Sequence, residues 1–88
     1  MEKIRIDLVR LKTEEDALKR FGRLKGMPAD YNSELEELHG ILQAWDKPLK
    51  IEIVIGGNIG PFIKLMEMLE DVRTTNNNLL FVVIMYMA

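Results

Sequence analysis

Carboxylates concentrate in one part of this sequence. Residues 27–46 carry five acidic side chains and no Lys or Arg. Residues 1–26 hold eight basic and five acidic groups (+3), and residues 47–88 hold four of each (0). Phosphates require cations, so a segment at −5 disfavours nucleic acid as its partner. The same charge attracts basic surfaces, and the sequence therefore predicts binding to a cationic protein. The five acidic residues are Asp30, Glu34, Glu36, Glu37 and Asp46.

Residue types that carry catalysis are sparse. The chain has no Cys, which removes thiolate nucleophiles, thiolate metal sites and disulfides. His39 is the only His, with no second metal-ligand candidate and no evident Ser and Asp partners. Glycosidase chemistry needs one carboxyl group held protonated, and nothing in the acidic segment suggests such an environment. We therefore expect no catalytic residue, no cofactor and no bound metal.

The segment Gly56-Gly57-Asn58-Ile59-Gly60 follows a predicted strand and precedes a predicted helix, where phosphate-binding loops occur. It lacks the Gly-Lys-Ser/Thr of a P-loop and the Gly-x-Gly-x-x-Gly spacing, and Pro61 removes an amide donor. A tight crossover is the simpler interpretation. A small phosphate- or nucleotide-binding domain remains a further hypothesis.

The spacing of apolar residues predicts the elements that position these side chains. Thr13 with Asp16 resembles a capping box and predicts a helix start. The alternation of strands and helices predicts one α/β domain over residues 1–88, with right-handed crossovers between three parallel strands. The expected elements are a strand over 3–8, a helix between Thr13 and Gly26, a helix from Ser33 to Pro48, a strand over 49–55, a helix from Pro61 to Arg73 and a strand over 79–87.

Several acidic residues also have structural explanations. Ser33 with Glu36 forms a capping box in sequence, so Glu36 could serve the helix start, a partner, or both. Glu34 and Glu37 could be solvated charges near the positive end of a helix. Each of these carboxylates therefore has two interpretations that the sequence leaves open.

The apolar residues of the second helix predict its buried face. Trp45 extends that face and is expected in the core more than at an interface. Gly40 costs a helix interior about 1 kcal/mol relative to Ala, which predicts close packing at Gly40 or an early helix end. Four methionines fall in elements with core patterning and are predicted to fill the core. The apolar face comprises Leu35, Leu38, Ile41, Leu42 and Trp45, and the methionines are Met66, Met68, Met85 and Met87.

Residues 27–49 combine several motifs in a fixed order. They begin with a Pro-x-x-Tyr loop (Pro28 to Tyr31) and continue with the acidic helix Leu35-Glu36-Glu37-Leu38, then Trp45, then a Pro48-Leu49 strand start. This order resembles the barstar family of ribonuclease inhibitors, and the flanking elements extend the resemblance over nearly the whole chain. The resemblance implies a two-layer, barstar-like fold with a three-stranded parallel sheet packed by helices. It also implies that the acidic helix and the loop before it block the cleft of a secreted ribonuclease, with carboxylates in the places of RNA phosphates.

The sequence departs from the family pattern at residues that the resemblance would place at the interface. The dominant helix aspartate of the family aligns with Gly40, and the preceding tryptophan aligns with His39. Glu36 replaces the first helix aspartate, and Asp30 replaces a loop tyrosine. An acid late in the last helix of the family corresponds to Glu70 or Asp71. Acidity is kept while its positions move, which leaves the target ribonuclease open.

We expect a cytoplasmic inhibitor or immunity protein, monomeric on its own, that binds a basic ribonuclease one to one and binds neither nucleic acid nor membranes. The alternatives are an interaction module of the same fold that no longer inhibits a nuclease, and a domain that self-associates through an exposed strand edge. The predicted partner-binding residues are Asp30, Tyr31, Glu34, Glu36, Glu37, His39, Gly40, Trp45 and Asp46.

Overall fold

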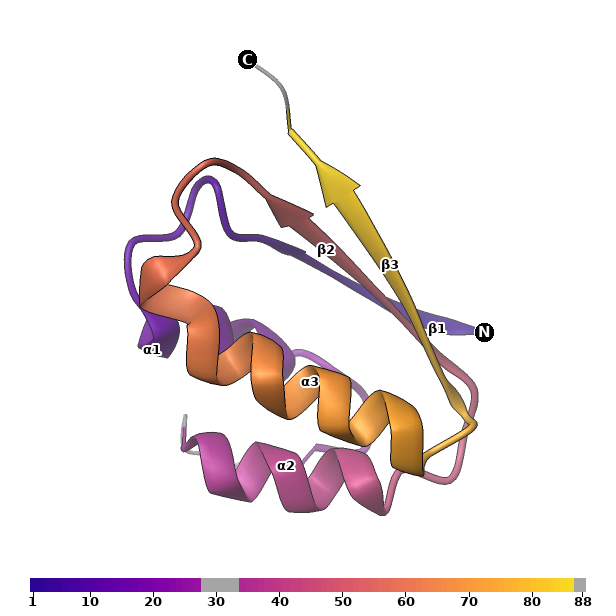
Figure 1. Cartoon of the computed structure of the whole chain (residues 1–88). Coiled ribbons are helices and arrows are strands. Elements are labelled where there is room, and N and C mark those ends of the chain that lie inside the picture. The colour runs from indigo at the N-terminus through magenta and orange to yellow at the C-terminus, as the bar shows by residue number, and fades with distance from the viewer. Residues whose placement is uncertain (28–33, 87–88) are drawn as a thin grey trace.

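The three strands and three α-helices alternate in the predicted order, β-α-α-β-α-β. The computed structural model describes residues 1–27 and 34–86. Figure 1 shows the sheet on one side of the molecule and the helices on the other. The elements are β1 (Glu2–Asp7), α1 (Glu14–Phe21), α2 (Leu35–Gln43), β2 (Leu49–Ile55), the short 3₁₀ helix η1 (Gly60–Phe62), α3 (Ile63–Thr75) and β3 (Leu79–Met85).

The sheet is parallel throughout, which confirms the predicted class. β2 lies in the centre and the strand order is β1-β2-β3. The register aligns Ile4 with Ile51 and Ile51 with Phe81, so side chains of like position face the same side of the sheet. Ile4, Ile6, Ile51 and Ile53 are buried on the side of the helices. Because the side-chain period of a strand is two, the intervening residues of each strand face the opposite side.

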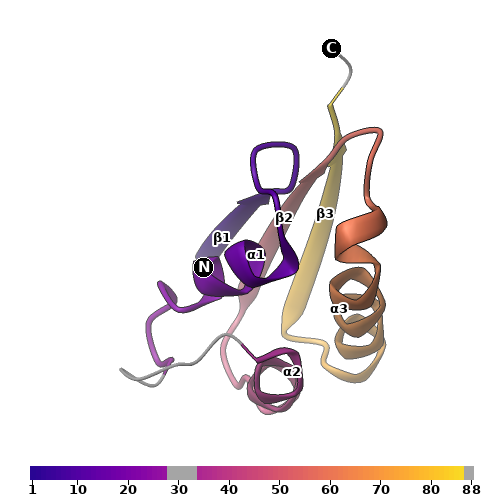
Figure 2. The same cartoon turned by 90° about the vertical axis from the view of Figure 1, so that its left-hand side faces the viewer.

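The helices all cover the same face of the sheet, so the molecule has two layers (Figure 2). Their buried apolar side chains and the inward residues of the strands form one core. That core includes Ala17, Leu18 and Phe21 of α1, Leu38 and Leu42 of α2, and Leu65, Leu69 and Val72 of α3. No helix in the described part of the chain is long and apolar enough to cross a membrane.

The start of α1 confirms the predicted cap, while its end corrects the prediction. The Asp16 amide donates to Thr13 Oγ1 over 3.2 Å, as expected for an N-cap threonine. The helix ends at Phe21, with Gly22 as its C-cap, and not at Gly26. Leu24 is buried from the turn that follows. An apolar residue three positions after Phe21 continued the helical spacing in sequence, although the backbone there had already left the helix.

Two other boundaries and one methionine differ from expectation. Pro61 lies in η1, and α3 begins two residues later and extends to Thr75, past the predicted end at Arg73. Met68 is buried and Met66 packs against the core, but Met85 is 63% exposed. Met85 lies at the end of β3, where the strand is not covered by helices, so the prediction that it fills the core was wrong. Met87 lies outside the described residues.

Asn76, which follows α3, connects the end of that helix to the end of α2. Its side chain is buried, and Nδ2 donates to the carbonyl oxygens of Leu42 (2.8 Å) and Trp45 (2.9 Å). Its Oδ1 accepts from the Asn78 amide at 3.0 Å. The last carbonyls of a helix have no partner within the helix. Asn76 therefore supplies the donors that the end of α2 lacks and ties α2 to the turn between α3 and β3.

Replacing Asn76 by Ala is expected to lower the free energy of unfolding by about 2–3 kcal/mol, because buried carbonyl oxygens lose their donor. Urea denaturation followed by circular dichroism measures the change. Asn77→Ala is the matched control, since Asn77 is the exposed neighbour in the same turn. Equal loss in the two variants would contradict this role of the Asn76 side chain.

Candidate protein-binding surface

The carboxylates predicted at the start of the second helix lie together and face solvent. Glu34 is the N-cap of α2, and Glu36 and Glu37 belong to its first turn. All three residues are exposed. Acidic side chains are favoured there because the first amide groups of a helix carry partial positive charge. Asp30 and Tyr31 lie outside the described residues, so their predicted contact with a partner stays a prediction.

The helix start differs from the capping box predicted for Ser33 and Glu36. The N-cap is Glu34, whose backbone is extended and whose carbonyl accepts the first helical hydrogen bond, from the Leu38 amide at 3.1 Å. Its side chain makes no capping hydrogen bond. With the N-cap at residue 34, Glu36 is not at the third helical position that a capping box requires. Ser33 itself lies outside the described residues, and Glu36 occupies the second helical position of α2.

Glu36 instead lines a groove between α2 and α3. The groove has a volume of about 450 Å³, with side chains of both helices on its walls. Glu36, Glu67 and Asp71 contribute three negative charges and Lys64 one positive charge, a net −2 with His39 neutral. Leu35 and Met68 supply apolar surface between the charges. The arrangement can accept the long aliphatic stem and the cationic end of an Arg or Lys side chain.

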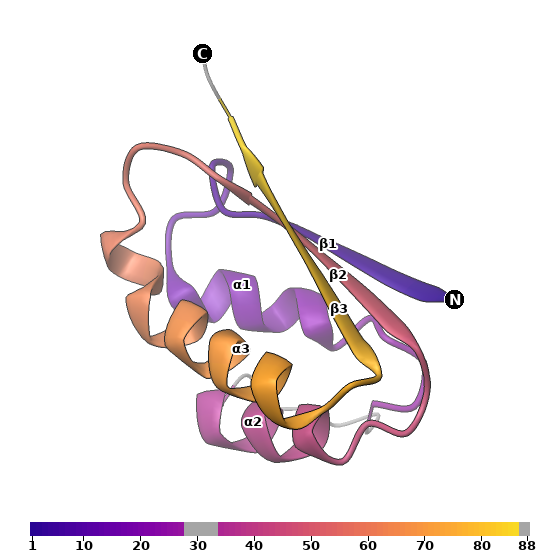
Figure 3. The ribbon, with the colours of Figure 1, turned by 45° about the vertical axis from the view of Figure 1, so that its right-hand side comes forward.

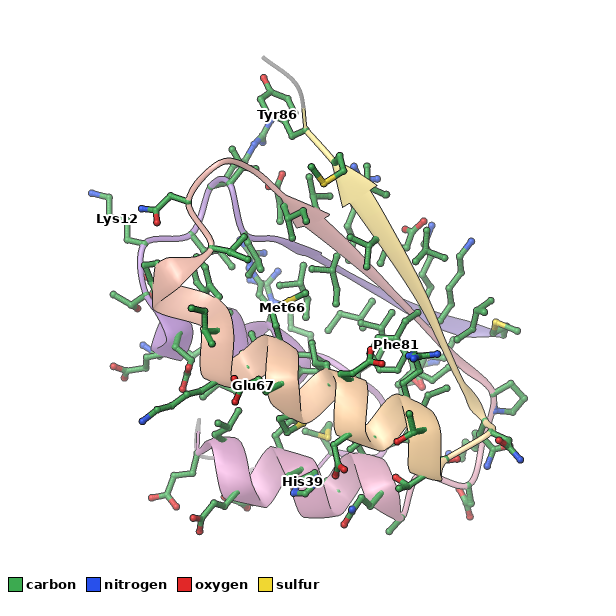
Figure 4. All side chains as sticks on the ribbon, in the orientation of Figure 1. Lys12, His39, Met66, Glu67, Phe81 and Tyr86 are labelled. Carbon is green, nitrogen blue, oxygen red and sulfur yellow. The ribbon has the colours of Figure 1, made fainter. Side chains whose placement is uncertain are left out.

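His39 connects the two walls of this groove. Its Nε2 lies 2.7 Å from Oδ2 of Asp71, on α3. His39 and Glu67 both line the groove, and Figure 4 labels them on α2 and α3. The contact brings an acid of the last helix beside the acidic start of α2. Of Glu70 and Asp71, neighbours in α3, only Asp71 lines this groove.

Glu70 is engaged elsewhere. Arg73 Nε donates to Glu70 Oε2 at 3.0 Å, and a second contact joins Arg73 Nη2 to Glu70 Oε1. The hydrogen bond from Arg73, together with its charge, holds the pKa of Glu70 below its ordinary value. The same pairing raises the pKa of Arg73. Glu70 is therefore neutralised by its own neighbour and adds little to the acidic surface.

The remaining acidic residues of α2 and α3, and the N-cap Glu34, have no Arg or Lys partner like that of Glu70 in the described part of the chain. Within the described residues, no Lys or Arg nitrogen lies within 4.0 Å of a carboxylate of Glu34, Glu36, Glu37 or Glu67. None of these four carboxylates therefore forms an ion pair with a Lys or Arg of the described residues, although Lys64 lines the same groove. We call Glu34, Glu36, Glu37, Glu67 and Asp71 the α2–α3 acidic surface.

Asp46 does not belong to this surface. It is exposed just after α2 and lines a separate hollow with Lys25 and Lys47. The nine residues of α2 span about 13 Å, so Asp46 is separated from Glu36 by roughly the length of the helix. Asp46 therefore lies apart from the carboxylates of the groove, and its predicted contact with a partner stays a prediction.

Trp45 belongs to the core, as its place on the apolar face predicted. It is 8% exposed and packs in the same cluster as Leu38 and Leu42. Its indole Nε1 is buried and has no hydrogen-bond partner among the residues that the structure describes. The backbone carbonyl of Trp45 accepts from Asn76 Nδ2, which fixes the chain at this point. The burial of Trp45 serves the fold more directly than it serves a partner.

Gly40 is not required by packing. It lies on the exposed side of α2, and a Cβ atom built there would meet no atom within 4 Å apart from the helix itself and its chain neighbours. The helix continues past it to Gln43. Both structural explanations predicted for Gly40, close packing and an early helix end, are therefore wrong.

The glycine-rich segment after β2 has a partial structural explanation. A Cβ at Gly56 would lie 3.1 Å from Cγ2 of Val9, so a side chain at this position would require Val9 to shift by a few tenths of an ångström. Gly57 has no such neighbour. The approach of the two loops favours the interpretation of a tight crossover for Gly56.

Comparison with known proteins adds no relative. No protein-family model matches the chain, and no curated protein matches it significantly. The structure thus defines a small α/β domain with a three-stranded parallel sheet and an acidic surface between its second and third helices.

Gly40→Ala is expected to raise the free energy of unfolding by about 0.5–1 kcal/mol, because Ala has the higher helix propensity and the site has room for its methyl group. Urea denaturation measures this change. A loss of stability would show that Gly40 is needed by a contact within the chain.

Proposed function

We propose that this protein inhibits a basic ribonuclease by binding its active-site cleft with the α2–α3 acidic surface. The observation that carries the proposal is that three carboxylates from two helices, Glu36, Glu67 and Asp71, line one open groove, and within the described residues none of them pairs with a Lys or Arg. The resemblance of residues 27–49 to barstar-type inhibitors supports the choice of a ribonuclease among basic proteins. Binding is one to one for each chain, and the protein performs no reaction.

The chemistry of the partner follows from the surface. A ribonuclease cleft carries Arg, Lys and His that bind RNA phosphates, and carboxylates can take the places of those phosphates. Charge-assisted hydrogen bonds between carboxylate and guanidinium are among the stronger polar contacts in proteins. Opposed charges also speed encounter and make the association sensitive to salt. The groove next to Leu35 and Met68 allows a partner cation to be taken out of water at least in part.

His39 and Gly40 distinguish this surface from that of the family it resembles. His39 is held by Asp71, and Gly40 offers no carboxylate where the family has its dominant aspartate. The negative charge is instead shifted toward the first turn of α2 and toward α3. The proposed target is therefore a ribonuclease whose cations lie opposite those positions.

Reversing two charges tests the proposal. Glu36→Lys combined with Glu37→Lys is expected to weaken binding by at least a factor of 10–100, since attraction becomes repulsion across the interface. Glu14→Lys combined with Glu15→Lys is the matched control, because it makes the same change of net charge in the first turn of α1. Titration of a panel of small microbial ribonucleases, followed by calorimetry and RNA hydrolysis at two salt concentrations, measures both variants. Failure to bind any basic ribonuclease, or equal loss in both variants, would refute the proposal.

A second substitution tests the role of position 40. Gly40→Asp is expected to increase the affinity for a barstar-type target at least tenfold, because the position is exposed and has room for the side chain. Gly40→Asn is the control of similar shape without charge. Binding without inhibition in the wild-type protein would favour the alternative, an interaction module of the same fold that has lost its action on the nuclease.

A further inference from the structure

We propose that the free edge of β3 pairs with the same edge of a second copy of this chain, which joins two sheets into one. β3 lies at the end of the sheet, after β2. Among the residues that the structure describes, no strand lies beyond β3 on the side away from β2 (Figure 3). A strand edge without a neighbour is a template for pairing with another chain. The proposal concerns a surface that the α2–α3 acidic surface does not include.

The hydrogen bonds of β3 show which backbone groups are free to pair. The Asn78 carbonyl accepts from the Leu49 amide (2.9 Å), and the Tyr86 amide donates to the Ile55 carbonyl (2.8 Å). Even-numbered residues of β3 therefore point their amide and carbonyl groups toward β2, because a parallel ladder alternates between its two sides. Odd-numbered residues point these groups to the free edge. The residues concerned are Phe81, Val83 and Met85.

The side chains of β3 include none of the residue types that prevent an edge strand from pairing. The strand reads Leu-Leu-Phe-Val-Val-Ile-Met, with no charge, Pro or Gly. Leu80 is 50% exposed, Val83 53%, Met85 63% and the adjoining Tyr86 56%. Natural edge strands usually carry charges, Pro or bulges that prevent association. Tyr86 stands at the protruding end of β3, clear of the helices (Figure 4).

The opposite edge of the sheet is protected. The Leu8 amide donates to the Val54 carbonyl, so even-numbered residues of β1 point their backbone groups toward β2. The residues whose backbone faces the free edge of β1 are Lys3, Arg5 and Asp7, and all three are charged. Association through β3 therefore leaves charged edges at both ends of the joined sheet and stops at two copies.

A second copy of this chain is the occupant that fits this edge. A two-fold axis places β3 of one copy beside β3 of the other. Because β3 carries no charged side chain, this pairing brings no like charges of the two strands together. A groove of about 260 Å³ beside β3 can receive side chains of the incoming strand. Its apolar walls come from α3, β3 and Ile53 of β2, and Glu70 and Arg73 also line it. The apolar residues are Ile53, Met66, Leu69, Phe81 and Val83.

The size of the contact sets its strength. One seven-residue edge and four partly exposed side chains bury less than the roughly 800 Å² per partner of a standard stable interface. The dimer is therefore weak and forms as the protein concentration rises. Because the strand carries no charge, the dimer should respond little to salt, unlike the proposed complex with a ribonuclease.

Sedimentation equilibrium from micromolar to millimolar protein tests the pairing. The wild-type protein is expected to reach the mass of a dimer and no higher. Val83→Lys is expected to weaken dimerisation at least tenfold, because it places a charge at the free edge. Val9→Lys is the matched control: Val9 is an exposed apolar residue (43%) in the turn after β1, away from β3. A wild-type protein that stays monomeric throughout, or equal weakening by the two substitutions, would overturn the proposal.

Amide hydrogen exchange of the wild-type protein gives a test without substitution. As concentration rises, exchange of the Phe81, Val83 and Met85 amides is expected to slow at least tenfold. The amides of Val82 and Ile84 already bond within the sheet and should change much less. An unchanged exchange rate at the three edge amides would refute pairing at β3, even if the protein dimerises. Neither result bears on ribonuclease binding, which uses the other surface.

Discussion

The position of α2 depends on the buried amide of Asn76. The last carbonyl groups of any α-helix lack hydrogen-bond donors within the helix. The last turn of α2 has no basic side chain that could donate to them. Asn76 provides that donor from the turn after α3, and Asn78 adds a further bond to the Trp45 carbonyl at 3.2 Å. The second helix is thereby fixed to the third. The groove between α2 and α3 exists because both helices are held by this turn and by the core beneath them.

Two helices share the negative charge of the proposed binding surface. The first turn of α2 presents Glu36 and Glu37, and α3 adds Glu67 and Asp71 from a segment whose overall charge is zero. Charge summed along the sequence therefore hides the contribution of α3. It also groups Asp46 with carboxylates that lie at the opposite end of α2. The spatial distribution is what a cationic partner would meet.

The two edge strands of the sheet differ in composition. β1 alternates buried Ile with charged residues, so its outer face and its free edge are both polar. β3 is apolar at every position, as is typical of a strand buried on both faces, although it lies at an edge. This conflict between composition and location motivates the proposed pairing of β3 with a second copy.

Local sequence determined the elements of this protein and their order. The alternation of Ile4 and Ile6, the Thr13 cap and the helical spacing of Leu38 and Leu42 act over a few residues, so they can be recognised without the fold. β-α-α-β-α-β order then limits the sheet to parallel strands joined by crossovers. The burial of Trp45 followed from the same periodicity.

Tertiary structure alone decided the partners of residues far apart in the chain. The His39–Asp71 contact spans 32 positions and the Asn76–Leu42 bond 34, and no local pattern encodes either. The position of the α2 N-cap at Glu34 depended on the extended backbone at that residue. The exposure of Met85 depended on which part of β3 the helices cover. The periodicity of apolar residues shows which face of a single helix or strand is buried, but not which other element covers it. Which charges gather, which polar groups satisfy one another and which strand edge stays open are set only when the elements pack.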